Sequence, residues 1–247
     1  MGGTIRLFKF SGIQVYLHFS WFLIAAYEFS QRKGVYASPV WAAAEIIALF
    51  SIVLLHEFGH ALACRQTGGV ANQIVLWPLG GIAFVSPPRR PGAMLWSIAA
   101  GPLVNVILLP ILSIALTLSR INTDAPSDLG LFLYHVWWIN LGLLIFNILP
   151  VYPLDGGQIL RSLLWFPLGE IRSLQIASGI GLVGSVALAG LMLLLGTPIF
   201  WTAIMSLFLI SRAVAGWQYA KALIQEEEAN RAARLVSTVP QPDRPSP

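Results

Sequence analysis

Long apolar stretches constrain this chain more than any other feature of its sequence. A helix that spans a lipid bilayer needs about 20 mostly apolar residues. Six stretches approach or exceed that length, at residues 13–29, 39–64, 93–118, 131–149, 177–195 and 198–216. Only 11% of the residues are charged, whereas a typical soluble domain has about 25%. The sequence therefore predicts an all-α polytopic membrane protein with about six transmembrane helices.

The segment between the second and third predicted helices has a different character. Residues 66–92 contain a Pro-Leu-Gly-Gly run at 78–81, and such breakers interrupt a helix. Short β-prone runs lie on either side, at residues 73–76 and 82–85. Non-helical backbone at membrane depth is tolerated only where protein or a water-filled cavity satisfies it. We therefore predict a short β-hairpin or re-entrant segment here, which also hints at a functional site.

Lysine and arginine residues are distributed unequally between the predicted loops. If the N-terminus is cytosolic, only Arg32, Lys33 and Arg120 of the 15 basic residues fall outside. This bias predicts a multi-pass protein with both termini in the cytosol. The net charge of +4 does not indicate a nucleic-acid partner, because the basic residues stand singly or in pairs between apolar runs.

The end of the chain differs in composition from the rest. Beyond residue 225 it is rich in glutamate, arginine and proline. Such a composition cannot bury enough apolar surface to fold by itself. We predict a single transmembrane domain over residues 1–224 and a disordered cytosolic tail over residues 225–247.

The second predicted helix carries the pattern His-Glu-x-x-His. His56 and His60 are four residues apart, so their imidazoles lie on one helix face and can share a metal ion. Glu57 stands beside them, where it could take a proton from a metal-activated water. Ionisable residues inside a spanning helix cost about 2.5 to 3.5 kcal/mol each on insertion scales. Three of them within five residues therefore indicate a functional role, and the pattern predicts one zinc ion.

Asp155 is the preferred third metal ligand. It follows the fourth predicted helix and precedes Gly156-Gly157, which permits a sharp turn and close approach of the backbone. The alternative is that Asp155 caps a helix beginning near Gln158. The other candidate ligands are His135, Glu170, His18, Glu45 and Glu28, with Glu170 as second choice.

Asn147 is a second candidate near the end of the fourth predicted helix. Its amide could hydrogen-bond a substrate carbonyl or a developing oxyanion. The alternative is an interhelical hydrogen bond, which is the stronger reading for Asn105 and Asn140. Gly101-Pro102 in the third predicted helix suggests close helix packing.

These motifs resemble the site-2 protease family of intramembrane zinc metalloproteases. The resemblance rests on residues 56–60 in one membrane helix and on residues 147–157 after another, and it covers roughly the first 165 residues. It implies a zinc ion held by His56, His60 and Asp155, with Glu57 as general base and Asn147 assisting the transition state.

The resemblance also implies partners and a location. Substrates would be transmembrane proteins cut within or near their spans, in the cell membrane of a prokaryote. Gly80 and Gly81 would help to bind an unwound substrate strand by main-chain pairing. Further partners compatible with the resemblance are a second copy of the chain, in a homo-oligomer, or a regulatory membrane protein. The 94 residues between His60 and Asp155 leave no room for a PDZ domain, and we expect no C-terminal nucleotide-sensing domains.

Two other functions are compatible with part of the pattern. A metal-binding transporter or channel would place histidines along a pathway, with polar residues spread over several helices. An inactive relative acting as a membrane chaperone would lack some of the essential residue types. The concentration of polar residues on two helices favours the endopeptidase.

Overall fold

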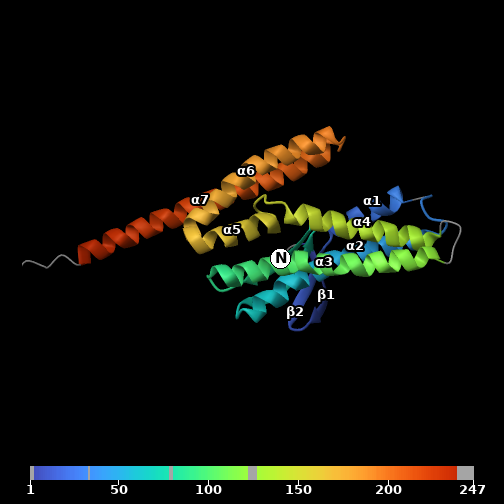
Figure 1. Ribbon diagram of the computed structural model, residues 1–247, viewed down its shortest axis with the longest axis horizontal. Coiled ribbons are helices and arrows are strands. Elements are labelled where there is room, and N and C mark those ends of the chain that lie inside the picture. Colours follow the sequence, from blue (N-terminus) through green and yellow to red (C-terminus); the bar gives the residue numbers. More distant parts are fainter. Residues whose placement is uncertain (1–2, 33, 78–79, 122–126, 238–247) are drawn as a thin grey trace, which may run out of the picture.

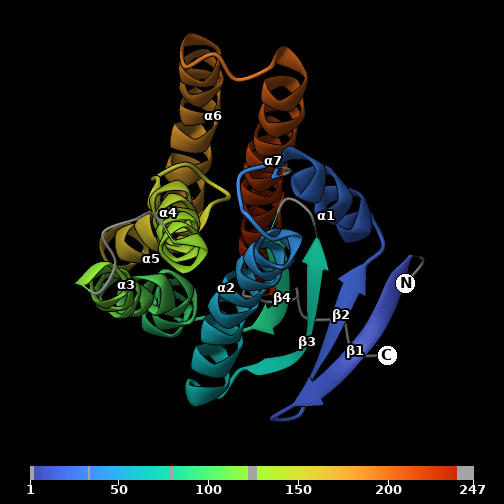
Figure 2. The ribbon, with the colours of Figure 1, turned by 90° about the vertical axis from the view of Figure 1, so that its right-hand side faces the viewer.

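The computed structural model describes residues 3–32, 34–77, 80–121 and 127–237. It consists mainly of helices, with one four-stranded sheet near the N-terminal end (Figures 1 and 2). The helices are α1 (Ser20–Gln31), α2 (Pro39–Gln66), α3 (Pro91–Ile121), α4 (Asp128–Ile148), α5 (Asp155–Leu168), α6 (Glu170–Leu194) and α7 (Ile199–Ser237). The strands are β1 (Thr4–Phe10), β2 (Ile13–His18), β3 (Val70–Trp77) and β4 (Gly80–Ser86).

The prediction of a spanning helix over residues 13–29 was wrong. Residues 13–18 form strand β2, and α1 has only 12 residues, about 18 Å of helix at 1.5 Å per residue. The physical reason is the period of the apolar residues. Ile13, Val15 and Leu17 alternate with more polar residues and are all buried, which is the pattern of a strand.

The sheet has the order β1-β2-β3-β4, and all its neighbours are antiparallel except β2 and β3. The protein is therefore not all-α. Strands β3 and β4 pair as a hairpin between α2 and α3, and the two residues that join them, 78 and 79, lie outside the described residues. Strand β4 pairs only with β3 among the described strands, so its other side is an edge.

Helix α2 packs along the sheet (Figure 2). Its first turn is favoured by Pro39 at the start of the helix and by Ser38, whose hydroxyl accepts a hydrogen bond from the Val40 amide. Phe58, Ala61 and Cys64 of α2 join the buried cluster of β2 and β3 side chains. This packing fixes the rotation of α2 about its axis and thereby the direction of its other face.

Four helices of the described part of the chain are long and apolar enough to cross a membrane. They are α2, α3, α4 and α6. By length and apolar composition, the described residues therefore contain four candidate spanning helices, whereas the sequence predicted six. The last two predicted spans correspond to α6 and α7, which lie side by side as a helical hairpin (Figure 1).

Helix α7 continues far beyond the predicted sixth span, to Ser237. Residues 225–237 are therefore helical, and residues 238–247 of the predicted tail lie outside the described residues. The division into a domain and a disordered tail stays a prediction.

Tyr152, in the connection between α4 and α5, packs against both helices of the α6–α7 hairpin at glycines. A Cβ added at Gly216 of α7 would lie 2.7 Å from Tyr152 Cε1, and one added at Gly181 of α6 would lie 2.5 Å from the Tyr152 carbonyl oxygen. Neither position has room for a larger residue. The hairpin is thus held against the connection that leads to Asp155.

Candidate metal centre

His56, Glu57 and His60 lie together on α2, and all three are buried, with 3–6% of each residue exposed. The four-residue spacing places the two imidazoles on the same helix face, as the sequence predicts. Their Nε2 atoms are 3.0 Å apart. The two rings thus present adjacent ligand atoms to one point.

The opposite ring nitrogens are held by other helices. Nδ1 of His56 lies 2.7 Å from Oδ1 of Asn105, and Nδ1 of His60 lies 2.9 Å from the carbonyl oxygen of Ser97. The Asn105 amide nitrogen donates to Asn140, which fixes which end of Asn105 faces His56. Each Nδ1 therefore carries the proton and donates it. In the neutral rings, Nε2 then offers its lone pair to a metal ion, as in metal-ligating histidines.

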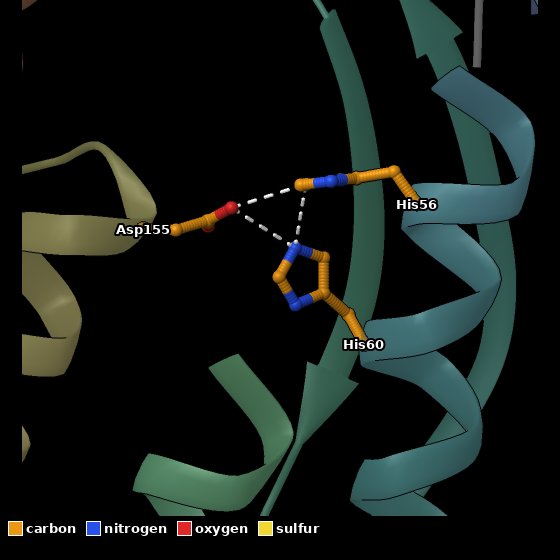
Figure 3. Close-up of side chains that lie close together, drawn as sticks. All are labelled: His56, His60 and Asp155. Carbon is orange, nitrogen blue, oxygen red and sulfur yellow. Dashed lines mark hydrogen bonds and ion pairs between the residues drawn. The ribbon is translucent and has the colours of Figure 1, made fainter. Parts of the chain in front are cut away.

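Asp155 approaches the two histidines from the first turn of α5 (Figure 3). Its Oδ2 lies 3.0 Å from Nε2 of His56 and 3.3 Å from Nε2 of His60. Gly156 and Gly157 make this approach possible, because a Cβ at either position would overlap the backbone of residues 148–152. Asp155 begins α5, so the alternative of a cap before a helix near Gln158 does not describe its position.

The neighbours of Asp155 favour the ionised form of its carboxyl group. Asp155 lies outside the four apolar helices. Burial alone would raise its pKa, but hydrogen bonds and positive charge from the neighbouring imidazoles, which carry a proton on Nε2 when no metal ion is bound, lower the pKa to about 2. A carboxylate must be deprotonated to bind a metal ion, and a lowered pKa favours that form.

A metal ion fits the three residues. Ligand atoms of His56, His60 and Asp155 all lie within 4.8 Å of one another. Although Oδ2 of Asp155 is close to both rings, it is a buried oxygen with no hydrogen bond of acceptable geometry. Two nitrogen lone pairs and a carboxylate oxygen facing one point need a cation between them. Two histidines and one carboxylate are also a known ligand set of catalytic zinc.

Glu57 stands beside this group and contacts the sheet. Its Oε2 accepts a hydrogen bond of 2.9 Å from the backbone N–H of Ala83 in β4. Ala83 pairs with Ile74 of β3 on its other side. The edge of β4 that is free of β3 is therefore turned toward Glu57.

The group lies in the wall of a cavity of about 540 Å³. Strand β4, helices α4 and α7 and the connection before α5 contribute to its lining. Lining residues outside the metal group include Ala83, Val85, Asn147, Tyr152, Phe208 and Arg212. The cavity gives the metal group a space in which a second molecule could bind.

Comparison with known proteins agrees with this geometry. Residues 44–122 and 119–195 match the family described as peptidase family M50. The chain is 36% identical over 198 residues to a zinc metalloprotease of Methanocaldococcus jannaschii, an alignment that covers 79% of this chain and 55% of that protein. The solved structure of the site-2 protease from Methanocaldococcus jannaschii superposes with a TM-score of 0.61 and 30% identity, covering 87% of this chain and 95% of that chain.

The chain belongs to peptidase family M50. The resemblance to the site-2 protease family is thereby confirmed. Stage IV sporulation protein FB of Bacillus subtilis is also similar, with 32% identity over 120 residues, 47% of this chain and 38% of that protein. The chain thus spans 38–55% of the length of these two curated relatives. With its four apolar helices, this M50 member is an integral membrane protein.

The other candidate ligands lie elsewhere in this M50 chain. His135 and Tyr36 contact the buried carboxylate of Glu45, whose other oxygen lies 2.6 Å from an Arg32 nitrogen. These residues tie the loop after α1 to α2 and α4. An arginine already neutralises Glu45, so this cluster does not need a metal ion.

Glu170, the second choice for the third ligand, is paired with arginines. Its carboxylate oxygens lie 3.0 Å from Arg89 and 3.7 Å from Arg161. His18 stacks on Trp77, with 4.2 Å between ring centroids, and Glu28 lies on α1. Among the described residues, neither these three nor the Glu45 cluster joins the metal-capable group.

Three further contacts of the M50 site are not evident from the sequence. Asn105 does form the predicted interhelical bond with Asn140, but it also holds His56. Ala83 contacts Glu57 through its backbone, which no side-chain pattern reveals. Gly101 lies against both imidazoles. The Gly101-Pro102 pair predicted close packing at Gly101, but the sequence did not indicate that the two imidazoles are what pack against it.

Gly101→Ala is expected to weaken zinc binding by at least about tenfold. A Cβ there would overlap the His60 ring and lie 2.9 Å from Nε2 of His56, so the rings must move. Ordinarily alanine in place of a helical glycine stabilises a helix by about 1 kcal/mol, so the effect is not one of helix formation. Competition with a chelator measures the affinity. The control is Gly142→Ala in α4, where an added Cβ meets no atom within 4 Å. Equal affinity in the two variants would contradict the assigned contact.

Proposed function

We propose that this chain is an intramembrane zinc endopeptidase that hydrolyses peptide bonds within or near the transmembrane segments of other membrane proteins. One observation carries the proposal above the rest. The free lone pairs of His56 and His60 and the carboxylate of Asp155 face one point, beside Glu57 and in the wall of a cavity. Family membership supports the same activity.

His56, His60 and Asp155 would hold the metal ion, one per chain. When bound, zinc supplies a Lewis acid and brings the pKa of a water molecule near neutrality. Glu57 accepts the proton of the attacking water and passes it to the leaving amine. Asn147, which lines the cavity, donates a hydrogen bond to the carbonyl oxygen as it gains charge.

The edge of β4 binds the substrate as an added strand. Residues two apart along a strand turn their N–H and C=O groups to the same side. Because the Ala83 N–H points to Glu57, the same groups of Gly81 and Val85 face that edge. Gly80 begins the strand. Main-chain pairing here would hold an unwound segment with its carbonyls exposed, which a helical substrate cannot offer.

The topology of the proposed enzyme follows the distribution of basic residues. We place both termini in the cytosol, the site below the cytosolic surface, and the protein in the cell membrane of a prokaryote. Residues 1–224 form the transmembrane domain. Strand β2 and α1 together make the first crossing and α7 makes the last, so with the four apolar helices the chain crosses six times and both termini lie on one side. Substrates are single-span or multi-span membrane proteins, and a second copy or a regulatory membrane protein is a further candidate partner.

A metal-binding transporter is not favoured. A pathway would need metal-capable groups at several depths. The described part of the chain has one such group, at a single depth on α2 and α5. Glu57 also has no role in that reading.

The experiment is a cleavage assay in proteoliposomes. Zinc-loaded chain is mixed with a single-span model substrate, and products are located by mass spectrometry. We expect a cut within or next to the span, loss of cutting in a chelator, and its return with added zinc. Zinc binding without cleavage of a varied panel of single-span substrates would contradict the proposal.

A further inference from the structure

One face of α7 lines the cavity of the metal group. Its lining residues are Met205, Phe208, Arg212, Ala215, Gly216 and Tyr219. Apart from the adjacent pair Ala215-Gly216, they recur every three or four positions, which is the spacing of a single helix face. One wall of the cavity therefore includes β4, whose free edge is proposed to pair with the substrate. Another wall is formed by this face of α7.

Arg212 differs from the rest of this face. It is the one lysine or arginine among the described residues of the lining. Its guanidinium carbon lies 5.8 Å from the ring centroid of Phe208, another lining residue. Within the described chain, Arg212 has no ion pair with any Asp or Glu. It is exposed, so its donors are open to a ligand.

The two carboxylates in the lining of the same cavity, those of Glu57 and Asp155, already have other partners. Glu57 accepts from the Ala83 N–H, and Asp155 faces the two histidines. An arginine in an apolar-walled cavity needs an anionic or water partner. The planar guanidinium presents paired donors that match a carboxylate with two parallel hydrogen bonds.

We propose that Arg212 is a specificity-determining residue that binds a carboxylate of the substrate. The inference rests on the proposed peptidase function and names a class of substrate for it. The carboxylate belongs to an Asp or Glu side chain near the cut, or to a free C-terminus, and both sources share this chemistry. Phe208 holds the guanidinium on the cavity side by stacking.

The test compares matched substrates in neutral-lipid proteoliposomes. Single-span substrates carry Asp or Asn at successive positions around the cut, and a further pair ends in a free carboxylate or an amide. Wild type is expected to cut the best acidic substrate about tenfold more efficiently than its neutral partner, mainly through KM. In Arg212→Gln the ratio falls to about one, and in Arg212→Glu it shifts toward a Lys-containing substrate. The control is Lys221→Gln, an exposed charge on α7 outside the lining, which keeps the wild-type ratio.

A second arm separates this inference from the peptidase proposal. Binding of the same labelled peptides is measured on Glu57→Gln and on Glu57→Gln/Arg212→Gln. A charge preference that depends on Arg212 supports the inference even if wild type cuts nothing, a result that would overturn the peptidase function alone. A ratio near one in wild type, or one unchanged in Arg212→Gln, overturns the role of Arg212. The cleavage assay is also repeated in proteoliposomes that contain anionic lipid. If the effect of Arg212→Gln depended on the anionic lipid content and not on the substrate charge, Arg212 would bind lipid headgroups and the proposed role would be overturned.

Discussion

Glu57→Gln is expected to lower the rate of peptide cleavage by about 10² to 10⁴-fold and to leave the zinc content unchanged. Glutamine keeps the size of the side chain and an oxygen that can accept from the Ala83 N–H. It cannot take a proton from water. The substitution therefore removes the general base and preserves the site around it, because Glu57 is not one of the three grouped ligands.

The measurement pairs initial cleavage rates with zinc content by mass spectrometry on the same preparations. Glu226→Gln is the matched control, since it makes the same chemical change at an exposed position of α7. Its rate and zinc content should equal those of wild type. If Glu57→Gln cleaved at the wild-type rate, Glu57 would not be the base, whatever its position beside the histidines.

Asp155→Ala is expected to reduce zinc affinity by at least about a hundredfold, and cleavage with it. Loss of residues that merely support metal ligands costs about ten- to a hundredfold, so loss of a ligand should cost more. The carboxylate oxygen lies 3.0 and 3.3 Å from the two Nε2 atoms, and alanine removes this anionic oxygen from the set of three ligands. Zinc competition with a chelator series measures the loss.

Glu170→Gln provides the comparison for Asp155→Ala. Glu170 is the other acidic residue that the sequence offered as a third ligand, and it pairs with Arg89 and Arg161. The structure predicts that this variant retains zinc. Retention of zinc by Asp155→Ala together with its loss from Glu170→Gln would reverse the assignment.

The centre of the site could be predicted from the sequence because helix geometry is regular. A four-residue spacing fixes two histidines on one face wherever the helix lies. Asp155 could be predicted because a helix end, a proline and two glycines are all readable signals of a turn. The structure brings these residues together, with Asn147 in the lining of the same cavity.

The rest depends on how elements pack, which periodicity does not encode. The contact of Gly101 with the imidazoles follows from the rotation of α3 against α2, and that rotation is set by many side chains at once. Arg212 looks like a topology signal in the sequence, although its helix face lines the cavity. Strand β2 was missed for another reason, because apolar content outweighed the alternation of Ile13, Val15 and Leu17.

The central claim is a single zinc ion held by His56, His60 and Asp155. X-ray absorption at the zinc edge of the purified, zinc-loaded chain tests it most directly. The structure predicts two imidazole nitrogens at about 2.0–2.1 Å, oxygen ligands at about 2.0–2.2 Å, and no sulfur. A sulfur ligand at about 2.3 Å, the distance of a cysteine thiolate, would contradict the claim. Cys64 is the one cysteine of the chain. A coordination shell without two imidazoles would contradict the claim as well.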